Sequence, residues 1–146
     1  LDTGRISLAA GAVGLMQRAL DLSLAYAGER KQFGKPIAQF QLVQEHLAAM
    51  KLDLEAARLL TYRAAWKKVK GEPYTLEASL AKLFASEAAN RVAYRAIQVH
   101  GGYGFFEEYE VARLYRDARI LTLYEGTSEV QKLIIGAHLT GVRAFA

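Results

Sequence analysis

Apolar residues recur at helical spacing along most of this 146-residue sequence, and both prolines fall between these stretches rather than inside them. No stretch alternates with the period of two that marks a β-strand. The periodicity predicts five helices, which cover about Thr3–Arg30, Ala38–Lys70, Thr75–Val99, Tyr109–Arg119 and Thr127–Val142. Long amphipathic helices joined by short turns are typical of helix bundles. The sequence therefore predicts an all-α fold, an antiparallel bundle of four to five long helices.

The composition limits the kinds of site that the chain can carry. With 52% hydrophobic and 23% charged residues, the chain has the make-up of one globular domain, which would cover residues 1–146. The absence of cysteine excludes disulfides, a thiolate nucleophile and cysteine-based metal sites. The three histidines, His46, His100 and His138, have no acidic or histidine partner four residues on, so no metal site is predicted.

The charge pattern and the apolar stretches argue against two classes of partner. The net charge of +4 arises from mixed signs, and the densest basic run, Lys67–Lys70, is interpreted as a solvated helix end. Because arginines and aromatic residues are not interleaved, no nucleic-acid partner is expected. The longest apolar stretch, Ile6–Met16, is too short to span a bilayer, so no membrane partner is expected either.

The segment LYEGTSEVQKLI (123–134) places an acid, Glu125, beside a glycine and two hydroxyls, directly before a run of aliphatic residues. Ser128 followed by Gln131 is typical of a capping box at the start of a helix. In that interpretation Glu125 is an ordinary acid near the positive end of a helix dipole. The alternative is a base held against a substrate. These residues alone favour the first interpretation.

Two turns and one charge pair are further candidates, each with a purely structural alternative. RKQFGKPI ends a helix, but its Arg30 and Phe33 also offer a guanidinium for a phosphate and a ring for stacking. The glycines of QVHGGYGF (98–105) either cap a helix or let backbone N–H groups approach a phosphate, without the spacing of a P-loop. Asp2 and Arg5 have the spacing of a surface ion pair of small energetic value. None of these features by itself names a reaction.

Four separated segments, taken together, resemble one known protein family. LDTGRISLAAGAVG, YAGERKQFGKPIAQFQLVQ, AIQVHGGYGF and YRDARILTLYEGTSEVQ occur in the order and spacing found in the acyl-CoA dehydrogenases. Over essentially its whole length the chain resembles the C-terminal helical domain of that family. The resemblance implies that the family's N-terminal helical domain and middle β-domain are absent from this chain.

The resemblance implies a reaction, the α,β-dehydrogenation of an acyl-CoA thioester, with FAD as cofactor and an electron-transfer flavoprotein as acceptor. Glu125 resembles the family's general base, which removes the α-proton, and Gly126 would leave room for the substrate. Asp2 and Arg5 match positions that touch the CoA portion. Some relatives carry their base at the position of Gly4, where this chain has no carboxylate. Short- or medium-chain, or simple branched, acyl groups are therefore expected.

The resemblance also implies a set of FAD-binding positions, several of which reach the FAD of a neighbouring subunit. The matching residues are Arg30, Gln32, Phe33, Phe40, Gln41, Gln98, Gly101, Gly102, Thr127 and Glu129. A site of this kind makes a homodimer or homotetramer the expected assembly, in the cytoplasm of a bacterium or archaeon or in the mitochondrial matrix of a eukaryote. Two alternatives stay open: an acyl-CoA oxidase, and an isolated, non-catalytic helical domain that self-associates.

Overall fold

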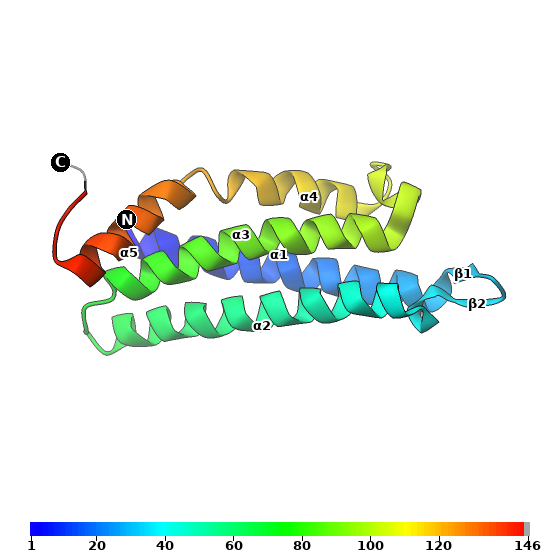
Figure 1. The fold of residues 1–146 in the computed structure, drawn as a ribbon, viewed down its shortest axis with the longest axis horizontal. Helices are drawn as coiled ribbons and strands as arrows, with labels where there is room; N and C mark the ends of the chain where they lie inside the picture. The colour runs from blue at the N-terminus through cyan, green and yellow to red at the C-terminus, as the bar shows by residue number, and fades with distance from the viewer. Residues whose placement is uncertain (145–146) are drawn as a thin grey trace.

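The computed structural model describes residues 1–144 as five α-helices with a small hairpin and two short 3₁₀ helices (Figure 1). The elements are α1 (Asp2–Glu29), β1 (Lys31–Gln32), β2 (Lys35–Pro36), η1 (Ile37–Gln39), α2 (Gln41–Val69), α3 (Thr75–His100), η2 (Gly101–Phe105), α4 (Glu110–Ile120) and α5 (Ser128–Thr140). The helices α1, α2 and α3 run side by side along the long axis, and α4 and α5 pack along α3 (Figure 1). The predicted all-α antiparallel bundle is confirmed. No helix within residues 1–144 is long and apolar enough to cross a membrane.

The centre of the bundle is α3, which contacts each of the other four α-helices. Its buried apolar face consists of alanine and valine residues, among them Ala78, Ala81, Ala85, Ala88, Ala89, Val92, Ala93 and Ala96. Alanine has the highest helix propensity and no side chain beyond Cβ, so neighbouring helices can approach α3 closely. Met16 from α1 and Met50 and Leu54 from α2 fill the space between the helices. This packing fixes the N-terminal ends of α1 and α5 relative to α3.

The connection between α1 and α2 forms a hairpin that the sequence analysis did not predict. The strands β1 and β2 are antiparallel, and the two residues between them, Phe33 and Gly34, have φ values of 51° and 77°. Positive φ at both turn residues is the geometry of tight two-residue hairpins. Strands of two residues are too short to show an alternating pattern, which is why periodicity does not reveal them. The hairpin and η1 delay the start of α2 to Gln41, three residues after the predicted start at Ala38.

The first turn of α5 is capped by Thr127, so the predicted capping box of Ser128 and Gln131 is wrong. The Thr127 hydroxyl accepts a hydrogen bond from the backbone N–H of Val130 at 3.4 Å. Ser128 lies one residue inside the helix, and its hydroxyl donates to the carboxylate of Glu87 on α3. The hydroxyl of Thr127 or of Ser128 could cap the helix. Because Ser128 is bound to Glu87 on α3, Thr127 is the N-cap.

Candidate active site

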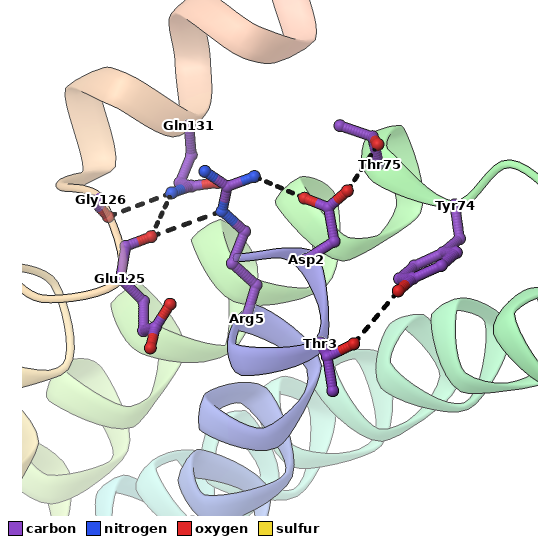
Figure 2. A network of polar contacts seen from close by, with 8 residues as sticks. All are labelled: Asp2, Thr3, Arg5, Tyr74, Thr75, Glu125, Gly126 and Gln131. Carbon is purple, nitrogen blue, oxygen red and sulfur yellow. Dashed lines mark hydrogen bonds and ion pairs between the residues drawn. The ribbon is translucent and has the colours of Figure 1, made fainter.

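Glu125 lies in the connection between α4 and α5 and has a backbone conformation that residues with a side chain rarely adopt (Figure 2). Its φ is 60° and that of the following Gly126 is 89°, so both residues are in the left-handed region. For a residue with a Cβ this conformation costs about 1–2 kcal/mol. Such strain persists only where the surrounding structure holds it, and it is concentrated at functional sites. The backbone thus distinguishes Glu125 from an ordinary acid near a helix start.

The carboxylate of Glu125 lies against the first turn of α1. One of its oxygens, Oε2, is buried and has no hydrogen-bond partner among the described residues. A Cβ added to Gly4 would lie 2.6 Å from Oε2 and 2.7 Å from Oε1, so only the absence of a side chain at residue 4 gives the carboxylate its place. A buried acceptor without a partner costs free energy. The arrangement leaves this oxygen free to accept a proton from a ligand.

A partly buried ion pair links the start of α1 to the Glu125 segment (Figure 2). Arg5 Nη1 donates to Asp2 Oδ1 at 2.7 Å, and the Thr75 hydroxyl donates to Asp2 Oδ2 at 2.6 Å. Arg5 Nε donates to the backbone carbonyl of Glu125 at 3.4 Å. Arg5 is only 6% exposed, whereas the side chain of Asp2 is 26% exposed, so the pair is partly buried and the surface ion pair suggested by the spacing is wrong. The contact of Asp2 and Arg5 with the CoA portion stays a prediction.

Two further side chains hold the Glu125 segment: Gln131, which the sequence assigned to a capping box, and Lys82, which no sequence motif singled out. Gln131 Nε2 donates to the carbonyls of Glu125 and Gly126 at 3.1 Å each, and Lys82 Nζ donates to the Gly126 carbonyl at 2.8 Å. Lys82 is fully buried, and its desolvation lowers the pKa of the ammonium group below its ordinary value. Lysine is almost never fully buried without a partner. A lysine within the alanine-rich face of α3 is therefore the sequence signal that could have identified it.

Gly126 is required by its neighbours as well as by its backbone conformation. A Cβ at this position would lie 2.7 Å from Gln131 Nε2 and 3.3 Å from a methyl carbon of Val130. Any larger residue would displace the Gln131 amide from the two carbonyls that it contacts. The small size of Gly126 thus has a reason within the chain, in addition to the predicted room for substrate.

Five of the predicted cofactor residues gather around one pocket at the other end of α1, with a volume of about 550 Å³. These residues are Arg30, Gln32, Gln98, Gly101 and Gly102. The guanidinium of Arg30 lies 5.4 Å from the centroid of the Tyr103 ring, and Gly101 has a φ of 61°. On the pocket wall the buried His100 ring stacks on the Tyr26 ring, with 4.3 Å between the ring centroids. Desolvation lowers the pKa of His100, which favours the neutral imidazole. A guanidinium beside aromatic rings and open glycine backbone suits an anionic, partly aromatic ligand.

The other predicted cofactor residues lie elsewhere on the bundle. Thr127 and Glu129 are at the start of α5, whereas Phe40 and Gln41 are at the start of α2, next to the hairpin. Phe33 lies in the hairpin turn and is 92% exposed. Its ring is edge-on to that of Phe40, with 6.1 Å between the ring centroids. The 28 residues of α1 separate the two ends of the bundle by about 42 Å. The structure therefore does not bring the ten predicted cofactor residues together within one chain.

Comparison with known proteins gives consistent matches over nearly the whole chain. The family model described as "Acyl-CoA dehydrogenase, C-terminal domain" matches residues 1–140. A probable acyl-CoA dehydrogenase from Bacillus subtilis is 55% identical over 95% of this chain, which covers 37% of that protein. A subunit of the caffeyl-CoA reductase-Etf complex of Acetobacterium woodii is 50% identical over 95% of this chain, which again covers 37% of the relative. The solved structure of butyryl-CoA dehydrogenase from Megasphaera elsdenii has a TM-score of 0.93 and 50% identity, over 94% of this chain and 36% of that one.

The matched region includes both ends of α1, the hairpin and the Glu125 segment. The chain spans little more than a third of the length of the curated relatives that it matches, at 37% of each. The chain belongs to the acyl-CoA dehydrogenase family, in which it corresponds to the C-terminal helical domain.

Proposed function

We propose that this chain is the C-terminal domain of an FAD-dependent acyl-CoA dehydrogenase, which catalyses α,β-dehydrogenation of acyl-CoA thioesters with Glu125 as the base. The observation that carries the proposal is the Glu125 carboxylate, with a buried and unpartnered oxygen and a strained backbone. A structural acid would be paired or solvated, whereas a base must keep a lone pair free for the substrate proton.

In the proposed reaction Glu125 accepts the α-proton of the thioester, and the carboxylate becomes a carboxylic acid. A bound flavin would supply the acceptor for the hydride that leaves the β-carbon. The backbone N–H of Glu125 would donate to the thioester carbonyl and stabilise the negative charge that develops on its oxygen.

The residues of this chain fit FAD in two separate groups. Thr127 and Glu129 would contact the flavin cofactor that serves Glu125 in the same subunit. Arg30, Gln98 and Gly101 would hold the anionic part of a second FAD in the 550 Å³ pocket, because about 42 Å of α1 is longer than an extended FAD molecule. Each site would then need two copies of this domain, which supports a homodimer or homotetramer. The family's N-terminal helical domain and middle β-domain would supply the rest of each site, so this chain alone is expected to be inactive.

The proposed substrate is a straight short- or medium-chain, or simple branched, acyl-CoA. The butyryl-CoA dehydrogenase relative supports a short acyl chain. The relative from the caffeyl-CoA reductase-Etf complex supports an electron-transfer flavoprotein as the partner. An acyl-CoA oxidase would instead consume oxygen without an acceptor flavoprotein, so oxygen uptake during butyryl-CoA turnover distinguishes the two. The proposed location is the cytoplasm of a bacterium or archaeon, or the mitochondrial matrix of a eukaryote.

The experiment is anaerobic flavin bleaching by butyryl-CoA, measured by stopped flow on the complete protein and on its Glu125→Gln variant. Loss of a positioned general base should slow bleaching by about 10²–10⁴-fold while FAD stays bound. Asp117→Asn, which neutralises an exposed acid on α4, is the matched control and should bleach at the wild-type rate. Rapid bleaching of Glu125→Gln would refute Glu125 as the base.

A further inference from the structure

The two carbonyls at the strained Glu125–Gly126 turn receive side-chain donors from three different helices. Arg5 of α1 and Gln131 of α5 donate to the Glu125 carbonyl, and Gln131 and Lys82 of α3 donate to the Gly126 carbonyl. Backbone carbonyls in a short connection are usually satisfied by water or by their own segment. Here the donors are charged or amide side chains that are all buried. This concentration of buried donors on one turn calls for a reason beyond stability.

Lys82 is the most costly of these donors. Its side chain is fully buried. Among the described residues its ammonium group makes one hydrogen bond, to the Gly126 carbonyl. Burying an ammonium group costs several kcal/mol, and an apolar residue of similar size commonly stabilises a core better. A methionine at this position of the alanine-rich face would continue the packing of α3. The hydrogen bond to the Gly126 carbonyl is what this chain sets against the cost of burying Lys82.

We infer that Lys82 and Gln131 are positioning residues, which hold the carbonyls of residues 125 and 126 and thereby fix the Glu125 carboxylate against Gly4. The inference rests on the proposed function of Glu125 as the base. Without the two donors the left-handed turn can relax, because only the long contact from Arg5 Nε to the Glu125 carbonyl, at 3.4 Å, remains. The carboxylate would then leave its place above the first turn of α1.

Lys82 also differs from Gln131 in carrying a charge. The charged groups that face it are Glu87 on α3, Arg5 on α1, Glu125 in the connection and Glu129 on α5. The three acids favour the ammonium form of Lys82, whereas desolvation and Arg5 oppose it. Gln131 holds the same turn without any charge. Replacing each residue separately distinguishes the loss of a hydrogen bond from the loss of a charge.

The test compares Lys82→Met and Gln131→Met in the complete protein, with Lys132→Met, an exposed lysine of α5, as the control. The methionine side chain is as long as that of Gln131 and one atom shorter than that of Lys82, and both test substitutions remove the donor. Hydrogen–deuterium exchange of the amides of residues 125–131 should become about tenfold faster in both variants and unchanged in the control, with the rest of α3 unaffected. Anaerobic flavin reduction by butyryl-CoA should slow by about 10–100-fold in both, because a misplacement of about 1 Å costs on that scale.

The saturating rate and the half-saturating concentration of butyryl-CoA separate positioning from substrate binding. In both variants the saturating rate of flavin reduction should fall while the half-saturating concentration stays near its wild-type value, because neither side chain is proposed to contact the substrate.

Three outcomes overturn the inference: unchanged exchange at residues 125–131 in both variants, faster exchange along all of α3, or unchanged rates in two folded variants that retain FAD. The exchange measurement needs no turnover. If the wild-type protein fails to reduce its flavin with any acyl-CoA, the proposed function is wrong, and the exchange data still decide whether the two residues hold the turn.

Discussion

Gly4→Ala should separate the stability of this domain from its activity. Gly4 lies in the first turn of α1 with helical geometry, so nothing in its backbone requires glycine. Alanine is favoured over glycine in a helix by about 0.5–1 kcal/mol. The new methyl group would, however, lie 2.6–2.7 Å from the carboxylate atoms of Glu125. The two effects act on different properties, because the clash involves only the flexible end of a side chain.

The size of the effect on activity follows from these distances. To reach an ordinary van der Waals separation of roughly 3.5 Å, the carboxylate must move by more than about half an ångström. A displacement of about 1 Å of a reacting group costs about 100-fold in rate. Gly4→Ala should therefore reduce the rate of flavin reduction by about tenfold or more, while the melting temperature stays the same or rises.

The assay is anaerobic flavin bleaching by butyryl-CoA, together with thermal unfolding, on the complete protein. Gly11→Ala is the matched control, since it lies in the same helix and a Cβ there meets nothing within 4 Å. It should gain a similar stability and bleach at the wild-type rate. A Gly4→Ala variant that bleaches as fast as Gly11→Ala would refute the placement of the carboxylate against the first turn of α1.

Two further predictions concern other parts of the bundle. Arg30→Ala should lower the FAD content of the purified complete protein, because Arg30 lines the 550 Å³ pocket. The melting temperature of the apoprotein should not change, since Arg30 is exposed. Lys31→Ala, which changes the exposed neighbouring residue, should retain FAD. For the buried Glu77, desolvation raises the pKa, but the hydrogen bond from Lys67 and the nearby Arg63 outweigh it and hold the pKa below its ordinary value. Because the folded state binds this proton less readily than the unfolded state, the stability from Glu77 is present above about pH 4.5 and is lost as the pH falls through the folded-state pKa. Urea unfolding of this chain at neutral and acidic pH should show a smaller acid loss for Glu77→Gln, and an equal loss would contradict this account.

The helices could be predicted from the sequence because their apolar periodicity is long and their breaks carry glycine or proline. Glu125 could be singled out from its motif, but its strained backbone and buried oxygen could not. Those depend on Gly4, which lies at the far end of the chain. The burial of Arg5 also depends on distant parts of the chain. The spacing of three residues between Asp2 and Arg5 predicts an ion pair but does not show which segments pack over it.

The residues that the sequence analysis missed share one property: their role is set by tertiary contacts. Lys82, the single lysine of α3, reads as one of several charged residues of that helix until α3 is placed at the centre of the bundle. Gln131 was interpreted as part of a capping box, whereas its amide faces the carbonyls of the preceding connection. Sequence pattern defines which side of a helix is apolar, but not which polar group will be needed inside it.

The uninterrupted length of α1 restricts how this domain can tolerate insertions and deletions. Arg5 and Arg30 stand at opposite ends of one continuous helix, so losing a single residue between them would turn one end by about 100° relative to the other and shorten the rod by about 1.5 Å. The hairpin pocket and the Glu125 segment would then face different directions. Changes in chain length should therefore be accepted at the turn after α2, around Gly71, and rejected anywhere within α1.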